Sequence, residues 1–241
     1  MKRIIIDSAY QHTRVALVED GELIELLWED KSNESIVGNI YVGRVMTVLP
    51  GMSAAFVDIG DNKNAYWYYK NKNSSYKPKV GDEILFQVEK ASSELKGANV
   101  TDKVSFPGKF TVLIPNDDDN IGISQKIVKT QERDRIKAIV SELLPEGYGI
   151  IVRTEGKGQT KEAFENEINS LYKKAEGVLN KGKYQKAPCI LDKDFSWIIK
   201  AAKDLFDNSI DECIINNENE YKEFCDMARE YNYFFSIIAT L

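Results

Sequence analysis

The sequence predicts a multidomain protein of mixed α+β and α/β class, and three observations lead to this prediction. Residues 36–69 contain short alternating runs separated by glycine- and proline-containing breaks, which is typical of a small antiparallel barrel. Residues 1–35 contain only β-prone runs, which cannot close a core alone and need partners from later in the chain. After Pro188, helical and strand patterns alternate, as in an α/β layer.

The composition is that of an ordinary globular protein. Of its 241 residues, 43% are hydrophobic and 29% are charged. No apolar run approaches the roughly 18 residues that span a bilayer. The basic and apolar start ends at Asp7, too early for a signal peptide, so we expect a cytoplasmic protein. The net charge of −6 counts against a generic nucleic-acid binder but permits a local basic groove.

Three widely spaced cysteines, Cys189, Cys213 and Cys225, form no C-x-x-C motif. His12 is the only histidine of the sequence. This pattern predicts buried free thiols rather than a zinc site or a disulfide framework.

The first 35 residues predict strands of a sheet. The β-prone runs at residues 2–6, 14–18 and 23–28 are the expected strands. Glu19, Asp20 and Gly21 separate the last two runs, and an acidic pair before glycine is a good hairpin signal.

The following segment predicts the barrel strands. Apolar and polar residues alternate over residues 40–47, and further strands are expected at 54–59, 65–69, 83–90 and 98–101, with loops at 70–79 and 92–97. Phe56 and Tyr66 fall on neighbouring strands, where exposed rings could stack on unpaired bases. A lone aromatic pair is more often part of the core, so the residues alone favour that interpretation.

The third segment combines strands with two helices. Residues 110–115 form a β-rich run, an acidic loop follows at 116–120, and a short segment spans 121–127. Helical spacing predicts helices from Thr130 to about 144 and over 161–180, with a strand at 149–153 between them. The buried stripe of the longer helix is expected to be Phe164, Ile168, Leu171, Ala175 and Val178.

The last segment predicts alternating helices and strands. An apolar stretch at 187–191 precedes a helix that Asp194 can cap and that runs to about 206. A strand at 210–215, a helix at 218–230 and a strand at 234–239 follow.

Two strings in the barrel segment carry a family resemblance. G-N-I-Y-V-G-R-V at residues 38–45 and L-P-G-M-S-A-A-F-V-D-I-G at 49–60 closely resemble the N-terminal part of the ribonuclease E/G family of bacterial endoribonucleases. The resemblance covers nearly the whole chain. It implies a ribonuclease-H-like domain at 1–35 and 188–241, interrupted by an OB-type RNA-binding barrel at 36–105 and a 5′-sensor subdomain of α+β type at 106–187.

The resemblance implies an RNA-binding site on the barrel. Phe56 and Tyr66 would stack on bases, and Lys96, beside Gly97, would contact the RNA backbone. Without the resemblance, Lys96 is an ordinary solvated loop lysine.

The resemblance also implies a pocket for the RNA 5′ end. Arg153 and Thr154, in I-I-V-R-T-E-G, would hold a 5′-monophosphate, and Val112, in V-L-I-P-N, would line the pocket of the terminal nucleotide. Lys126 lies at a basic position nearby. A guanidinium forms bidentate hydrogen bonds with phosphate, although a lone arginine after a strand is most often a surface ion-pair partner. Three carboxylates at 117–119 would weaken this pocket unless their loop points away.

The family cleaves RNA with a following domain of deoxyribonuclease-I-like fold, in which two aspartates hold a magnesium ion that activates water. The sequence stops at Leu241 directly after an expected strand, so we expect the catalytic domain to be missing and the chain to be inactive alone, without catalytic residues, metal or cofactor. Asp7, Asp58, Asp61 and Asp82 lack the spacing of a metal motif.

The expected function is the RNA-binding and 5′-end-sensing part of an endoribonuclease that cleaves single-stranded RNA in ribosomal RNA processing and messenger decay. The expected partners are single-stranded RNA, preferably with a 5′-monophosphate, and the catalytic domain, and we expect a monomer without membrane contact. Two alternatives stay open: a natural non-catalytic RNA-binding regulatory protein, and a structural or interaction module in which the barrel rings are buried.

Overall fold

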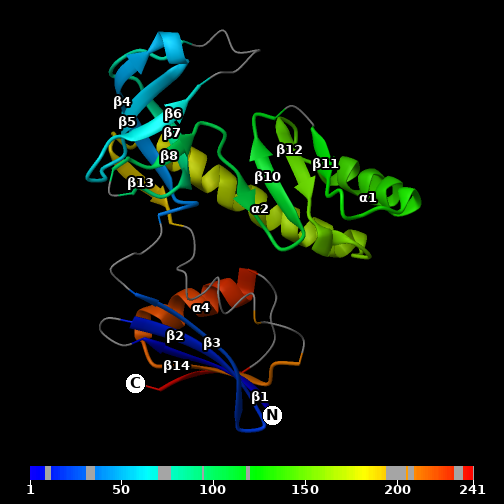
Figure 1. Ribbon diagram of the computed structural model, residues 1–241. Coiled ribbons are helices and arrows are strands. Elements are labelled where there is room, and N and C mark those ends of the chain that lie inside the picture. The colour runs from blue at the N-terminus through cyan, green and yellow to red at the C-terminus, as the bar shows by residue number, and fades with distance from the viewer. Residues whose placement is uncertain are drawn as a thin grey trace. The chain divides into compact units, whose positions relative to one another are not determined.

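The computed structural model describes residues 1–8, 12–30, 36–69, 77–93, 95–117, 120–193, 205, 209–230 and 236–240. The chain divides into two compact units, one of Met1–Ser35 with Phe195–Leu241 and one of Ile36–Asp194, whose elements are labelled in Figure 1. Most of the predicted loop at 70–79 and nearly all of the predicted helix at 194–206 lie outside the described residues.

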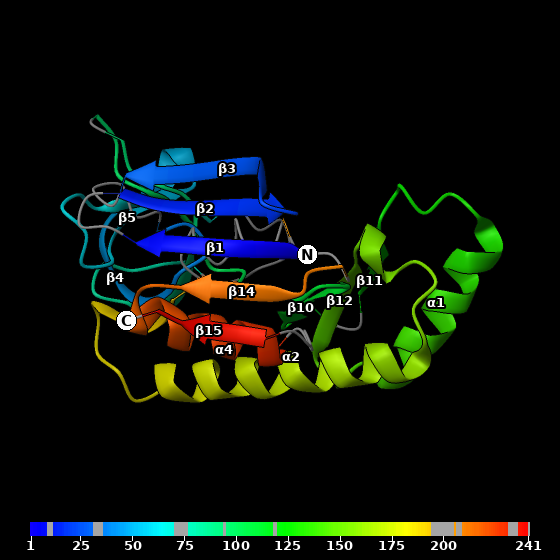
Figure 2. The ribbon, with the colours of Figure 1, turned by 90° about the horizontal axis from the view of Figure 1, so that it is seen from below.

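The first unit is built on a five-stranded sheet with the order β15–β14–β1–β2–β3 (Figure 2). Its elements are β1 (Lys2–Ser8), β2 (His12–Glu19), β3 (Glu22–Asp30), β14 (Glu212–Ile215), α4 (Glu218–Glu230) and β15 (Ser236–Ala239). The predicted hairpin between β2 and β3 is confirmed, and Asp20 and Gly21 both have positive φ, as a tight hairpin turn requires. The first strands find their expected later partner, because β1 pairs in parallel with β14.

The core of this unit lies between the sheet and α4. Ile4 and Ile6 of β1 pack with Phe224 and Met227 of α4, and all four side chains are buried. Cys213 of β14 belongs to the same core, and burial raises the pKa of its thiol. All three cysteines are free, but the prediction of buried thiols holds only for Cys213, because the other two are half-buried.

The second unit begins with a closed barrel of five strands. These are β4 (Ile40–Leu49), β5 (Ala54–Asp58), β6 (Ala65–Tyr68), β8 (Asn99–Thr101) and β7 (Glu83–Lys90), and pairing of β7 with β4 closes the ring. A short 3-10 turn, η2 (Pro50–Met52), connects β4 to β5, and β13 (Cys189–Asp192) pairs with β4. The barrel is confirmed, but it is not purely antiparallel, since β6 pairs with β8 in parallel.

A glycine makes room for the barrel core. The interior contains large side chains, among them Trp67 and Phe86. A Cβ at Gly43 of β4 would lie 2.7 Å from Val57 and 2.8 Å from Phe86, so only glycine fits at this point of the strand.

The remainder of the second unit is a four-stranded sheet with two helices. Its strand order is β11–β12–β10–β9. The elements are β9 (Phe106–Pro107), β10 (Thr111–Pro115), β11 (Ile121–Ile123), α1 (Thr130–Leu143), β12 (Tyr148–Val152), the 3-10 turn η3 (Thr154–Gly156) and α2 (Lys161–Gly182). Leu113, Ile150 and Val152 are buried in the cores that the sheet forms with the helices.

The helix α2 connects the small sheet to the barrel (Figure 1). Its stripe is buried as predicted, and Thr160 accepts a hydrogen bond from the backbone N–H of Ala163 at its first turn. Leu171 and Val178 share one core with Ile40 of the barrel and Leu113 of the small sheet. This packing explains why both faces of β4 are covered along its first half. Among the described helices, none has the length and apolar character needed to cross a membrane.

Candidate nucleic-acid interface

Two aromatic rings lie side by side on the outer surface of the barrel. Phe56 of β5 and Tyr66 of β6 are directly paired across the strands, with ring centroids 6.0 Å apart and an interplanar angle of 70°. Their sequence neighbours Val57 and Trp67 point into the barrel core. Phe56 is 36% exposed and Tyr66 is half-buried, so the interpretation of both rings as core residues is wrong.

Lys96 lies in a loop that rests against the start of β6. A Cβ at Gly97 would lie 2.1 Å from the backbone oxygen of Asn64, which shows how closely the two chain segments approach. The backbone N–H of Tyr66 donates to the carbonyl of Ala98 over 2.7 Å. The exposed Lys96 therefore lies in a loop next to β6, the strand that contains Tyr66.

The second candidate region is the face of the small sheet opposite its buried face. Val112 of β10 pairs with Ile151 of β12, and both alternate with residues buried beneath the helices. Ile151 is 43% exposed. Its neighbour on β11 is Gly122, which has no side chain to cover it. Arg153 follows Ile151 by two residues and therefore continues the same face. An apolar strip thus leads to a guanidinium group.

The guanidinium of Arg153 is held by the turn between β9 and β10. Its Nη1 donates to the carbonyl of Gly108 over 2.9 Å, and the backbone N–H of Arg153 donates to the carbonyl of Phe110 over 2.7 Å. The first bond uses one of the five N–H donors of the guanidinium, and the side chain is exposed.

Two hydroxyl groups lie at the end of the sheet where Arg153 follows β12. β11 and β12 are parallel, with Ile123 opposite Val152, so the residues that follow the two strands lie at the same end of the sheet. The hydroxyl oxygens of Ser124 and Thr154 are in hydrogen-bond contact at 3.1 Å. The backbone N–H of Lys126 donates to the Ser124 hydroxyl over 3.3 Å, which places a further cation on this loop. Ser124 was not predicted, because parallel pairing of two distant strands leaves no local sequence signal.

A second arginine, also not predicted, supports the loop after β11. Arg133, in the first turn of α1, donates through Nη1 to the carbonyls of Ser124 at 2.8 Å and Ile127 at 3.1 Å. Because its guanidinium donates to main-chain carbonyls, Arg133 positions the loop that carries the Ser124 hydroxyl.

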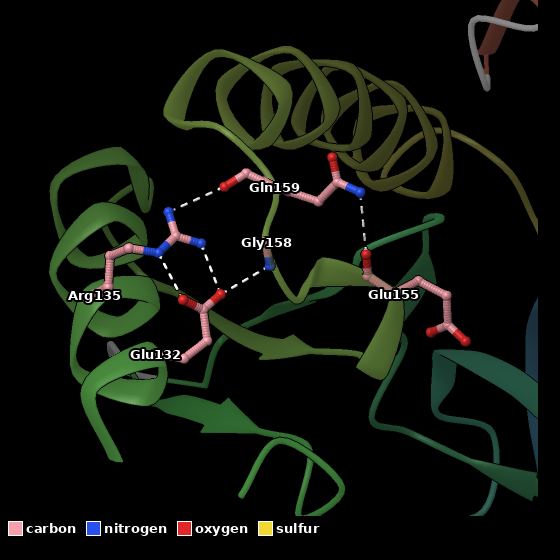
Figure 3. Close-up of polar contacts among 5 residues, drawn as sticks. All are labelled: Glu132, Arg135, Glu155, Gly158 and Gln159. Atoms are coloured by element: carbon pink, nitrogen blue, oxygen red, sulfur yellow. Dashed lines mark hydrogen bonds and ion pairs between the residues drawn. The ribbon is translucent and has the colours of Figure 1, made fainter. Parts of the chain in front are cut away.

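The loop after Thr154 is held against α1 by hydrogen bonds to the two members of an ion pair within that helix, Glu132 and Arg135 (Figure 3). Glu132 accepts two hydrogen bonds of 2.8 Å from the Arg135 guanidinium, and the backbone N–H of Gly158 donates to the same carboxylate over 2.8 Å. Arg135 also donates to the carbonyl of Gln159 over 3.0 Å. These hydrogen bonds, first that from Arg135 and then that from Gly158, lower the pKa of Glu132 to about 2.

The acidic loop before β11 lies at the other end of the strands. A Cβ at Gly149 would lie 2.6 Å from the Asp117 carboxylate, so this carboxylate sits beside the start of β12. Arg153 follows Gly149 by four residues, about 13 Å along an extended strand. The negative charge of Asp117 is therefore remote from the guanidinium. Residues 118 and 119 lie outside the described part of the chain.

The carboxylates considered as metal ligands take part in local hydrogen bonds. Asp58, Asp61 and Asp82 accept hydrogen bonds from nearby backbone N–H groups, and Asp7 accepts one from Asn216. In the part of the chain that the structure describes, no group of three or more His, Cys, Asp or Glu side chains is placed to hold a metal ion. The carboxylates of these residues therefore do not form a magnesium site.

Comparisons with known proteins point to one family. The sequence model described as "Ribonuclease E/G family" matches residues 105–237. The chain is 30% identical over 247 residues to ribonuclease E of Escherichia coli K12, covering 96% of this chain and 23% of that protein. It is 28% identical over 246 residues to ribonuclease G of Salmonella typhimurium, covering 95% and 50%. It is 35% identical over 200 residues to ribonuclease G of Haemophilus influenzae, covering 75% and 40%. The chain thus spans half or less of the length of these three relatives.

Proposed function

The chain belongs to the ribonuclease E/G family, and on this basis we propose that it binds single-stranded RNA and senses its 5′ end as part of an endoribonuclease. One observation carries the proposal. Arg153 and the paired hydroxyls of Ser124 and Thr154 follow the neighbouring parallel strands β12 and β11 at the same end of the small sheet, beside the apolar residues Val112 and Ile151.

This arrangement suits a terminal phosphate on a nucleotide. The guanidinium donates two N–H groups to a phosphate, and a hydroxyl can donate to a third oxygen. Val112 and Ile151 offer an apolar surface to the terminal base or sugar. A 5′-hydroxyl end carries no charge and gains none of the charge-assisted bonds, so the pocket prefers a 5′-monophosphate.

The barrel supplies binding that is independent of the 5′ end. Phe56 and Tyr66 stack on unpaired bases, and Lys96 contacts a phosphate between them. Base stacking on aromatic rings is tolerant of sequence, so this surface holds many RNAs. Because the net charge is −6, attraction to RNA depends on a few local cations rather than on the whole surface.

The architecture supports the finer assignments of the domains. The sheet order β15–β14–β1–β2–β3 suits the ribonuclease-H-like domain expected at 1–35 and 188–241, with a structural role, except that β13 within the second segment pairs with β4 of the barrel. The closed barrel suits an OB-type domain at 36–105, and the small sheet with its helices suits a 5′ sensor at 106–187. Cleavage with magnesium, in ribosomal RNA processing and messenger decay, belongs in this proposal to a further catalytic domain.

The test compares one short single-stranded RNA with a 5′-monophosphate and with a 5′-hydroxyl end, using fluorescence anisotropy. Charge-assisted hydrogen bonds are worth about 1.5–3 kcal/mol each, so the native chain should bind the phosphorylated RNA at least roughly tenfold more tightly. Arg153→Ala should abolish this preference and leave the affinity for the hydroxyl end nearly unchanged. Arg229→Ala, an exposed arginine of α4, is the matched control and should leave both affinities unchanged.

Two results would contradict the proposal. An equal loss of affinity for both end types in Arg153→Ala would remove the pocket assignment. A weak salt dependence would favour an interaction module instead, because contacts with the phosphates of a single strand lower log K by about 0.7 per contact for each tenfold rise in salt.

A further inference from the structure

A carboxylate of α2 is enclosed by the turn between β9 and β10. Oε1 of Glu167 accepts hydrogen bonds from the backbone N–H groups of Phe110 at 2.9 Å and Thr111 at 2.8 Å, and from the Thr111 hydroxyl at 2.7 Å. Oε2 accepts from the backbone N–H of Lys109 at 2.7 Å. One side chain thus holds three consecutive main-chain donors, an arrangement that normally receives a bound anion.

The turn fits closely around this carboxylate. A Cβ at Gly108 would lie 2.7 Å from Cδ of Glu167 and 2.8 Å from Oε1, so glycine leaves the space that the carboxylate fills. The backbone N–H of Gly108 donates to the carbonyl of Thr111 over 2.7 Å and closes the turn. The position of the Gly108 carbonyl is therefore tied to Glu167.

The same turn holds Arg153. The carbonyl of Gly108 accepts from the guanidinium, and the carbonyl of Phe110 accepts from the Arg153 backbone. We propose that Glu167 is a positioning residue for the 5′-end pocket, acting through the turn to aim the Arg153 guanidinium at the terminal phosphate. The inference rests on the proposed function of that pocket.

The chemistry explains why the carboxylate acts indirectly. A carboxylate placed against Arg153 would form a bidentate ion pair and compete with the phosphate for the same N–H groups. Here the carboxylate is bound by main-chain donors, and a neutral carbonyl orients the arginine. The guanidinium keeps its full charge while its long side chain is ordered in advance, which reduces the entropy lost on binding.

The experiment uses the full chain and the same pair of RNAs as above. Glu167→Gln keeps the shape but turns one acceptor into an NH₂ group that faces main-chain donors. We expect the ratio of affinities for the phosphorylated and the hydroxyl RNA to fall by roughly three- to tenfold, as for loss of one oriented hydrogen bond. The affinity for the hydroxyl RNA should change by less than about twofold, because the barrel is untouched.

Controls separate positioning from stability. Glu176→Gln, on the same helix, replaces the charged acceptor of the Tyr148 hydroxyl, at 2.7 Å, with a neutral and weaker one, and it should lower Tm without changing the ratio. Thr111→Val removes only the hydrogen bond from the Thr111 hydroxyl to Glu167. This variant tests the inference if Glu167→Gln does not fold. Its ratio of affinities for the two RNAs should fall less than that of Glu167→Gln. Gly108→Ala crowds the carboxylate, and its effect should not add to that of Glu167→Gln.

The outcomes are distinct. A native chain that prefers the phosphorylated RNA, with the full ratio kept in Glu167→Gln and Thr111→Val, overturns this inference and leaves the proposed function standing. If the affinities for both RNAs fall equally and Tm falls with them, the role of Glu167 is purely structural, and this result also overturns the inference. A native chain without preference overturns the proposed function, and the inference with it.

Discussion

At the scale of single residues, the exposed ring pair is an unusual use of aromatic side chains. Phe56 is 36% exposed on a surface strand, where a polar residue would keep its contacts with water. Its ring makes an edge-to-face contact with the ring of Tyr66, a favourable geometry for an aromatic pair. Such a pair presents apolar ring surface to the solvent.

Phe56→Ala and Tyr66→Ala should each weaken RNA binding by about 1–3 kcal/mol, because each removes a stacking surface. The loss should be equal for phosphorylated and hydroxyl 5′ ends, and urea unfolding should change little because both rings lie outside the core. Anisotropy measures the affinity. Tyr184→Ala, which removes a tyrosine that is 85% exposed after α2, is the control and should bind as the native chain does. Unchanged affinity in both ring variants would contradict the stacking role.

At the scale of elements, local patterns predicted well what local chemistry determines. The helices α1 and α2 begin at Thr130 and Lys161 as predicted, because apolar spacing and flanking signals define them. The strand β4 was predicted, but its alternation over residues 40–47 is interrupted by a bulge between Val45 and Thr47. What the sequence could not reveal depends on contacts between distant segments. The parallel pairing of β11 with β12 brings Ser124 to Thr154, and the crossing of α2 brings Glu167 to the β9–β10 turn.

The tie between α1 and the loop after η3 should survive mild acid. The pKa of Glu132 is lowered from 4.5 to about 2, so the contribution of this contact is complete above pH 4.5 and is lost as the pH falls through about 2. The amide of Gly158, which donates to Glu132, should keep its NMR shift down to roughly pH 3.

Arg135→Gln provides the control, because the bond from Arg135 is the main cause of the lowered pKa. In this variant the Gly158 amide should titrate at a higher pH, closer to the ordinary glutamate range. A native midpoint already in that range would show that the ion pair does not persist in solution.

Gly97→Ala should destabilise the barrel. A Cβ at this position would lie 2.1 Å from the Asn64 oxygen, so the backbone must shift, at a typical cost of about 1–3 kcal/mol. Gly51→Ala is the matched control, since a Cβ there meets no atom within 4 Å. Urea unfolding compares the two variants, and equal midpoints would mean that the Lys96 loop does not rest on β6.

At the scale of the whole molecule, the two units have separate cores. The core of the first unit combines strands from both ends of the chain, whereas the three buried clusters of the second unit draw on residues 36–194. Each unit therefore contains the apolar contacts that its own fold needs.

Residues 36–194 produced alone should fold and bind RNA with the same preference for a 5′-monophosphate, because the ring pair and the residues of the proposed pocket all lie inside this unit. The amide NMR spectrum of the shortened protein should overlay on that of the full chain for these residues. A spectrum without dispersion would show that the barrel and the small sheet depend on the other unit.

The parallel pairing of β1 with β14 has a consequence for synthesis on the ribosome. The paired residues Ile4 and Cys213 are roughly 200 positions apart, and translation at about 5–20 residues per second separates them by roughly 10–40 s. During that interval the nascent β1 has an open edge, while residues 36–194 emerge complete. Limited proteolysis of arrested nascent chains should find this inserted segment protected first. The oldest part of the chain is then the last to reach its final structure, and its open edge is what a ribosome-bound chaperone would meet.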